Sequence, residues 1–136
     1  MARILIVDDS PSQLMGIRRI VEKLGHEALT AEDGAAGVEA AKREIPDMIL
    51  MDVVMPNLNG FQATRSITRE ASTKHIPIVL VTTKDQDTDR VWGMRQGAKA
   101  YITKPFSETE LADIIQQMLG EPAAPEAPAE PAEPAE

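Results

Sequence analysis

The stretch that decides the fold is Ile49-Leu50-Met51-Asp52-Val53-Val54-Met55-Pro56, an apolar run that ends on a single acid and continues into a loop. Residues 48–51 are all apolar, which is typical of a strand buried on both faces of a parallel sheet. In open α/β sheets, ligands bind at the carboxyl ends of the strands, where Asp52 would lie. We therefore expect the rest of the domain to be organised around Asp52.

Apolar strand-like and helix-like segments alternate five times along the chain, which predicts an α/β fold with a parallel sheet covered on both faces. The expected strands are residues 3–7, 27–31, 47–52, 76–82 and 100–103. The expected helices are residues 11–24, 36–44, 61–71, 85–96 and 107–119.

Small polar residues and glycines predict where these helices begin and end. Ser10 and Ser107 are the expected N-caps, and Glu110, three residues after Ser107, completes a capping-box pattern. Gly25 and Gly97 are the expected helix ends.

The composition excludes several classes of protein. The chain has 136 residues and no cysteine, which predicts one domain without disulfides or a thiolate metal site. The apolar run at residues 4–7 is too short for a signal peptide or a membrane span, so we expect a cytoplasmic protein without membrane insertion. Only 3% of residues are aromatic and there is no basic stripe, which argues against nucleic-acid binding.

The last sixteen residues differ from the rest of the chain. Residues 121–136 contain only Glu, Pro and Ala, a composition that cannot build a core and that predicts an extended, disordered acidic tail. The net charge is −8, and five glutamates of this tail leave −3 for residues 1–120. We expect residues 1–120 to be the folded domain and the tail to be a solvated spacer, with a docking role as the alternative.

Polar side chains follow the expected strands where each one ends. Asp8 and Asp9 follow the first strand, Asp52 ends the third, Thr82 ends the fourth and Lys104 follows the fifth. The carboxyl ends of parallel strands share one edge of a sheet, so we expect these groups to converge. Three neighbouring carboxylates repel one another unless a cation joins them, and their oxygens suit Mg²⁺, with Mn²⁺ as the alternative.

A divalent cation beside a lysine and a hydroxyl indicates a phosphate site. The cation and Lys104 would neutralise phosphoryl oxygens, Thr82 would donate a hydrogen bond, and Asp52 would be the nucleophile that forms an aspartyl phosphate. The backbone carbonyl of Val54 could complete the metal ligands. The chain has no glycine-rich nucleotide-binding motif, so the phosphoryl group must come from another molecule.

Four short motifs resemble the receiver domains of bacterial two-component response regulators, the CheY-like family. They are LIVDDS (5–10), LMDVVMP (50–56) followed by NG, VTT (81–83) and YITKPF (101–106), and the resemblance covers residues 2–119. It implies a flavodoxin-like (βα)5 fold with strand order 2-1-3-4-5. It also implies that Asp52 accepts a phosphoryl group from a histidine kinase, and that Asp8, Asp9 and the Val54 carbonyl hold the metal.

The same resemblance assigns switching and tuning positions. Thr82 resembles the family's switch hydroxyl and Tyr101 its switch aromatic, while Lys104 resembles the family's lysine and precedes Pro105 in an expected cis peptide. Val54 and Lys84 stand at the two positions that tune the chemistry. Because an apolar Val54 cannot orient a hydrolytic water, we expect slow or partner-tuned autodephosphorylation.

The expected output surface is formed by the fourth helix, the fifth strand and the fifth helix. On the fourth helix Val91, Met94, Arg95 and Ala98 share one face, and Trp92 lies about 100° to the side. We expect Trp92 to be half buried against the domain, with an exposed partner contact as the alternative. Gly93 costs helix stability, which predicts close packing or the approach of a partner. His26 and His75 are expected to be ordinary surface histidines.

The segments VTTKDQDTDRVWGMRQGAKAYITKP (81–105) and NGFQATR (59–65) particularly resemble stand-alone receivers of type IV pilus chemosensory systems. We therefore expect a monomeric phosphoacceptor, not an enzyme in its own right, that controls twitching motility or chemotaxis through a protein effector. A phosphate sink or relay without an effector is the alternative. An aspartyl-phosphate hydrolase would need an acid where Val54 stands, and the scarcity of aromatic residues disfavours a flavin carrier.

Overall fold

A five-stranded parallel sheet forms the centre of the computed structural model, which describes residues 2–84 and 86–119. The strands, in spatial order, are β2 (Glu27–Ala31), β1 (Arg3–Val7), β3 (Met48–Met51), β4 (Ile78–Thr82) and β5 (Ala100–Thr103). The predicted α/β fold and its strand order are thereby confirmed. The tail at 121–136 and the predicted domain end at Gly120 lie outside the described residues.

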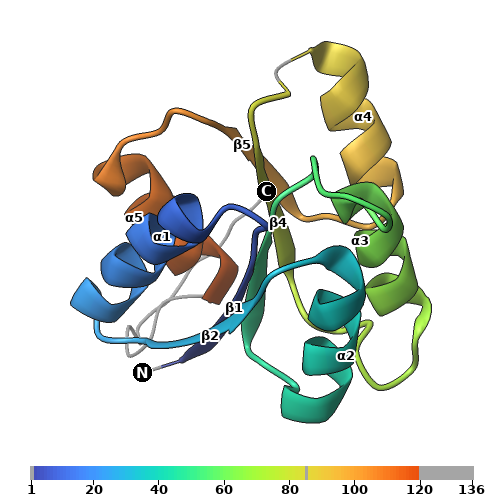
Figure 1. The fold of residues 1–136 in the computed structure, drawn as a ribbon, viewed down its shortest axis with the longest axis horizontal. Helices are drawn as coiled ribbons and strands as arrows, with labels where there is room; N and C mark the ends of the chain where they lie inside the picture. Colours follow the sequence, from blue (N-terminus) through green and yellow to red (C-terminus); the bar gives the residue numbers. More distant parts are fainter. Residues whose placement is uncertain (1, 85, 120–136) are drawn as a thin grey trace, which may run out of the picture.

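Five helices cover the sheet in two layers. They are α1 (Pro11–Lys23), α2 (Gly34–Glu44), α3 (Gly60–Arg69), α4 (Asp87–Arg95) and α5 (Glu108–Leu119). Helices α1 and α5 lie on one face, and α2, α3 and α4 lie on the other (Figure 1). Among the residues that the structure describes, no helix has both the length and the apolar character needed to cross a bilayer.

The central strand β3 is buried on both sides, as its sequence predicts. Met48 and Leu50 belong to the core beneath α1 and α5, whereas Ile49 and Met51 belong to the core beneath α2 and α3. None of the four is more than 1% exposed. Because both faces of β3 are covered, only its carboxyl end is left for polar chemistry, and this end is where Asp52 stands.

The helix caps agree with the sequence in most places and differ in one. At α5, Glu110 N–H donates to Ser107 Oγ (3.0 Å) and Ser107 N–H donates to Glu110 Oε1 (2.8 Å), which confirms the capping box. Gly25 and Gly97 have φ values of +91° and +109° and end their helices, as predicted. Ser10 does occupy the N-cap of α1, but its hydroxyl makes no capping bond, so that part of the prediction is wrong.

Several predicted boundaries shift by one or two residues. Helix α2 begins at Gly34 rather than at residue 36, because Asp33 is its N-cap and the Asp33 carboxylate accepts from Ala36 N–H (2.7 Å). Helix α3 begins one residue early at Gly60, where Asn59 forms a capping box that the sequence reading missed. Strands β3 and β4 are shorter than predicted, and the predicted start of the fourth helix, residue 85, lies outside the described residues.

Four apolar residues recur at helical spacing in residues 11–24, and three of them, Leu14, Ile17 and Val21, are buried against the sheet. The fourth, Leu24, is 38% exposed, because it is the C-cap of α1 and follows the last helical turn. The helix is therefore held to the sheet by three turns of apolar contacts.

Several glycines allow close approaches that a side chain would block, and two of them, Gly60 and Gly93, bear on the site. A Cβ on Gly60 would lie 2.1 Å from the backbone oxygen of Asp52, so this glycine lets α3 begin directly against the end of β3. A Cβ on Gly93 would lie 2.5 Å from Leu80 Cδ1. Close packing of α4 on the sheet, one of the two expectations for Gly93, is confirmed.

Candidate functional site

Three carboxylates meet at the carboxyl edge of the sheet. Val7 and Met51 are paired across β1 and β3, so Asp8 and Asp52, which follow them, emerge side by side. The N–H of Asp52 donates to the Val7 carbonyl (2.9 Å), which extends this pairing to the site itself. Asp8, Asp9 and Asp52 each place an oxygen within 4.8 Å of the others. The predicted acidic cluster is therefore present.

The environment of Asp52 disfavours its charged form. Asp52 is 7% exposed, and this burial raises the pKa of its carboxyl group to about 6. The charges of Asp8 and Asp9 also raise the pKa, while Lys104 and the N–H of Val53 act in the opposite direction. A carboxylate in this position gains from any added cation, because the cation offsets both the burial and the neighbouring charges.

Lys104 follows β5, the outermost strand of the sheet, and its side chain reaches the acidic cluster. Its Nζ lies 3.0 Å from Asp8 Oδ2 and 3.6 Å from Asp52 Oδ1, and the side chain is only 12% exposed. The predicted cis peptide between Lys104 and Pro105 is confirmed. Lys104 also donates a hydrogen bond to the side chain of Gln13, a residue that the sequence reading missed. Gln13 lies on a helix, so reading the strand ends could not identify it.

Thr82 ends β4, the strand next to β3, and is fully buried. Its Oγ1 accepts a hydrogen bond from the N–H of Lys84 (3.2 Å), and its carbonyl accepts from the N–H of Lys104 (2.7 Å). The hydroxyl is thus held beside the loop that leads into α4. The structure places Thr82 on the same edge as the carboxylates, as the sequence predicts.

Tyr101 is half-buried on β5 and is tied to the same loop. Its hydroxyl donates to the Lys84 carbonyl (2.8 Å), so Thr82 and Tyr101 are both bonded to the backbone of Lys84. The guanidinium carbon of Arg90 lies 5.1 Å from the centre of the Tyr101 ring, a cation–π distance. Arg90 also donates to the Tyr101 carbonyl (3.4 Å). The sequence reading missed Arg90, because its role depends on which way α4 faces.

The two predicted tuning positions face solvent. Val54 is 54% exposed, and the side chain of Lys84 is 45% exposed, with its Nζ 4.0 Å from Asp89 Oδ1. Both line a groove of about 380 Å³ together with Trp92, which is 48% exposed. Trp92 therefore lies beside the site, half covered by the domain.

The predicted face of α4 is only partly as expected. Val91 and Met94 are exposed large apolar residues, at 54% and 46%. Arg95 is exposed and ends the helix, and Ala98 lies beyond its end, where it is buried at 4% exposure. Ala98 therefore does not share a helix face with Val91 and Met94, and that part of the prediction is wrong.

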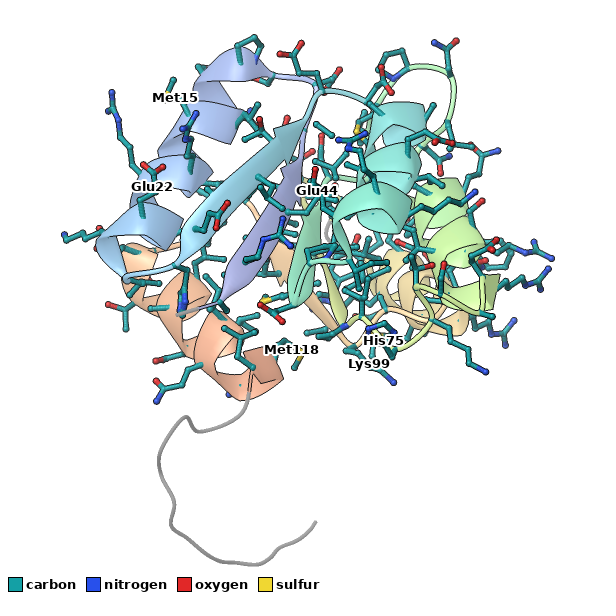
Figure 2. All side chains as sticks on the ribbon, turned by 90° about the horizontal axis from the view of Figure 1, so that it is seen from below. Met15, Glu22, Glu44, His75, Lys99 and Met118 are labelled. Atoms are coloured by element: carbon teal, nitrogen blue, oxygen red, sulfur yellow. The ribbon has the colours of Figure 1, made fainter. Side chains whose placement is uncertain are left out.

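The histidines lie away from the acidic cluster. His75 precedes β4 and Lys99 precedes β5, so both lie at the end of the sheet where these strands begin (Figure 2), opposite the end that carries Asp52. His26 precedes β2, and its Nδ1 accepts from the N–H of Ala2 (3.0 Å). Burial lowers the pKa of His26, which keeps the ring neutral at physiological pH. Neither histidine is placed to exchange a phosphoryl group with Asp52.

The donor set of the cluster fits a hard divalent cation. Its groups are carboxylates, Asp8 is 1% exposed, Asp9 is exposed, and the Asp52 carboxyl group has a raised pKa that a cation would relieve. Oxygen ligands open to water on one side are typical of Mg²⁺ sites in proteins. The residues present therefore fit magnesium.

The fold and the acidic edge define the class to which the chain belongs. The family model described as "response regulator receiver domain" matches residues 4–116, and the chain belongs to this family. The sheet order and helix layers are those of the CheY-like, flavodoxin-like fold. This agrees with the family that the sequence motifs indicate.

Three known proteins illustrate the similarity. Protein PilH of Pseudomonas aeruginosa is 56% identical over 119 residues, which cover 88% of this chain and 98% of PilH. The crystal structure of the Vibrio cholerae chemotaxis protein CheY4 has a TM-score of 0.83 and 31% identity, and the match covers 88% of this chain and 99% of that one. The receiver domain of a Pseudomonas aeruginosa sensor histidine kinase, solved with a magnesium ion coordinated in its active-site cleft, has a TM-score of 0.82 and 33% identity over 88% of this chain and 98% of that one.

Proposed function

We propose that this chain receives a phosphoryl group on Asp52 from a phosphohistidine of a histidine kinase, in a reaction that requires Mg²⁺. The observation that carries the proposal is the position of Lys104, whose ammonium lies between Asp8 and Asp52 at 3.0 and 3.6 Å. A buried lysine beside a nucleophilic carboxylate is suited to neutralise the oxygens of an incoming phosphoryl group.

In the proposed transfer, an oxygen of the Asp52 carboxylate attacks phosphorus and the P–N bond to the donor histidine breaks. The leaving imidazole nitrogen keeps the electron pair of that bond, and the new mixed anhydride stays on Asp52. Lys104 neutralises one phosphoryl oxygen, and the Thr82 hydroxyl turns from Lys84 to donate to another. Asp8, Asp9, Asp52 and the Val54 carbonyl would hold Mg²⁺, which would supply further charge neutralisation.

Movement of Thr82 would change the loop that also holds Tyr101. Both hydroxyls bond to the backbone of Lys84, so a change in one bond alters the support of the other. We propose that this change alters the surface formed by α4, β5 and α5, and that a protein effector binds there. The exposed side chains of Val91 and Met94 on α4 support a protein contact at this surface.

The 56% identity to PilH supports a role in a chemosensory system that controls type IV pili. The exposed apolar Val54 beside the site supports slow autodephosphorylation, since it offers no group to orient an attacking water. Lys84 at the same groove could pair with an acid of a partner that accelerates the reaction. A phosphoryl lifetime of seconds in the isolated protein would contradict the proposal of slow hydrolysis.

Intact mass spectrometry tests the phosphoacceptor proposal. The protein is incubated with acetyl phosphate, with and without Mg²⁺, as wild type, as Asp52→Ala and as Asp33→Ala, which removes a carboxylate that caps α2 instead. We expect one added phosphoryl group in the wild type and in Asp33→Ala, only with Mg²⁺, and none in Asp52→Ala. An adduct that persists in Asp52→Ala would place the reaction elsewhere and overturn the proposal.

A further inference from the structure

A glutamine on α1 reaches the lysine of the acidic site. Gln13 and Lys104 are 91 residues apart in sequence, and the Lys104 ammonium donates a hydrogen bond to Gln13 Oε1. Gln13 is exposed, whereas Lys104 is mostly covered. Both residues line a groove of about 380 Å³ between α1 and residues 104–106. The contact is therefore made at the open side of the site.

The local structure at the start of α1 leaves Gln13 available for this contact. The sequence Ser10-Pro11-Ser12-Gln13 has the spacing of a capping box, in which Gln13 would bond back to Ser10 N–H. Instead, Ser10 N–H donates to Asp8 Oδ1 (2.8 Å), and the Ser10 hydroxyl makes no capping bond. Because Asp8 has taken that donor, the Gln13 amide is free to turn toward Lys104.

The hydrogen bonds of the Lys104 ammonium define how it is oriented in the site. A lysine ammonium carries three donors and no acceptor, so the Gln13 atom that faces it must be the amide oxygen. One donor goes to Asp8 Oδ2 at 3.0 Å and a second to Gln13. Asp52 Oδ1 lies 3.6 Å from the ammonium, so the third donor remains available to it. A long, flexible lysine is thus held by two acceptors beside the nucleophile.

We propose that Gln13 is a positioning residue for phosphoryl transfer: it holds the Lys104 ammonium so that one N–H is directed at Asp52 and at the oxygens of the arriving phosphoryl group. This inference rests on the proposed function of Asp52 as phosphoacceptor. Without Gln13, the ammonium keeps only its bond to Asp8 and samples several orientations, so a part of the transition-state stabilisation is lost.

Phosphorylation kinetics test the proposal in variants of matched size. Gln13→Met keeps the length of the side chain and removes the acceptor, Gln13→Glu keeps an acceptor, and Gln117→Met makes the same change at an exposed position of α5. With acetyl phosphate and Mg²⁺, we expect Gln13→Met to react about three- to tenfold more slowly than the wild type. A tenfold loss in rate corresponds to about 1.4 kcal/mol of transition-state stabilisation. Gln117→Met should react at the wild-type rate. Gln13→Glu, which keeps an acceptor, should react faster than Gln13→Met and nearly as fast as the wild type.

A double-mutant cycle separates positioning from a general structural effect. In a Lys104→Met background there is no ammonium to position, so Gln13→Met should change the rate by less than about 1.5-fold. The same three- to tenfold loss in both backgrounds, or no loss in the single variant, would overturn the proposal. Circular dichroism and thermal melts of each variant establish that the fold is retained.

A measurement on the metal-free protein does not depend on phosphorylation. Nitrogen-15 NMR of the lysine side chains should show the Lys104 ammonium protected from proton exchange in the wild type, and at least threefold less protected in Gln13→Met. Unchanged protection would contradict the positioning contact. If the wild type itself takes up no phosphoryl group, the proposed function fails, and this NMR comparison alone decides whether Gln13 orients Lys104.

Discussion

The acidic edge and the α4 side of this domain are built in different ways. Asp8 and Asp52 extend two paired central strands, and the α1 helix above them buries Leu14, Ile17 and Val21. Helix α4, in contrast, buries only Gly93, while Val91, Trp92 and Met94 are exposed. The groups proposed to carry the chemistry are therefore fixed by the core, whereas the surface proposed to change is held by the close packing at Gly93 and a few polar contacts. This difference is what the proposed switch requires: a site that stays in place and a neighbouring surface that is free to change.

The largest expected effect is a loss of stability when a methyl group is added at Gly60 or Gly93. Gly60→Ala puts a Cβ 2.1 Å from a backbone oxygen of the rigid edge, so the backbone must move, and we expect a loss of about 3 kcal/mol or more in the free energy of unfolding. Gly93→Ala meets the far end of the Leu80 side chain at 2.5 Å, which can move, and we expect about 1–2 kcal/mol.

Urea denaturation of both variants measures these losses, with Gly16→Ala as the control. Gly16 lies within α1 with nothing near its Cβ position, so this change should stabilise the protein by about 0.5–1 kcal/mol through helix propensity. A greater loss for Gly93→Ala than for Gly60→Ala would contradict the contrast between the two regions.

The second prediction is that the stability of the metal-free protein depends on pH through the charge of Asp52. Its folded-state pKa of about 6 lies above the unfolded value, so the folded state is favoured while Asp52 is protonated, and this contribution is lost as the pH rises through 6. Asp52→Asn removes the penalty of the buried charge. At pH 8 we expect Asp52→Asn to be more stable than the wild type by about 1–3 kcal/mol, and at pH 3.5 we expect no gain.

Denaturation of both proteins at several pH values checks this dependence, in the presence of a chelator. Adding Mg²⁺ should stabilise the wild type at pH 8 and reduce the advantage of Asp52→Asn, because the cation offsets the same charges. An advantage of Asp52→Asn that does not change between pH 3.5 and 8 would show that the raised pKa is not its cause.

The smallest expected effect is on the α4 side. Tyr101→Phe removes only the hydroxyl that donates to the Lys84 carbonyl, so global stability should change by less than about 1 kcal/mol. Amide hydrogen exchange of the loop at residues 82–84 and of α4 should become about three- to fivefold faster, while exchange in β1 and β3 stays the same. Equal acceleration in the central strands would mean that the two regions open together.

The sequence predicted this site as far as strand ends could define it. Asp8, Asp52, Thr82 and Lys104 each follow an apolar run, and the rule that parallel strands end at one edge brings them together. Gln13 could not be found in this way, because its spacing from Ser10 indicates a capping box that Asp8 prevents.

Other polar contacts also differ in how far the sequence could predict them. Ser107 and Glu110 do form the capping box that their spacing predicts, with the Ser107 N–H donating to Glu110 as the pattern requires. Arg90 was missed because the side of α4 that meets Tyr101 is set by the packing of Gly93, which only the folded structure shows. Local sequence patterns therefore predict the helices, the strands and the residues at the strand ends. Which side-chain hydrogen bonds form depends on competition between neighbouring polar groups in the folded structure.

The central claim is that occupation of the acidic edge alters the α4 side of the domain. NMR spectra recorded with Mg²⁺ before and after addition of beryllofluoride, a phosphoryl analogue, test it most directly. We predict large amide shifts at Asp52, Thr82, Lys84 and Tyr101 and along α4, with little change along α2 (Gly34–Glu44). Shifts confined to residues 8–9 and 52–54, with none in α4 or β5, would contradict the account.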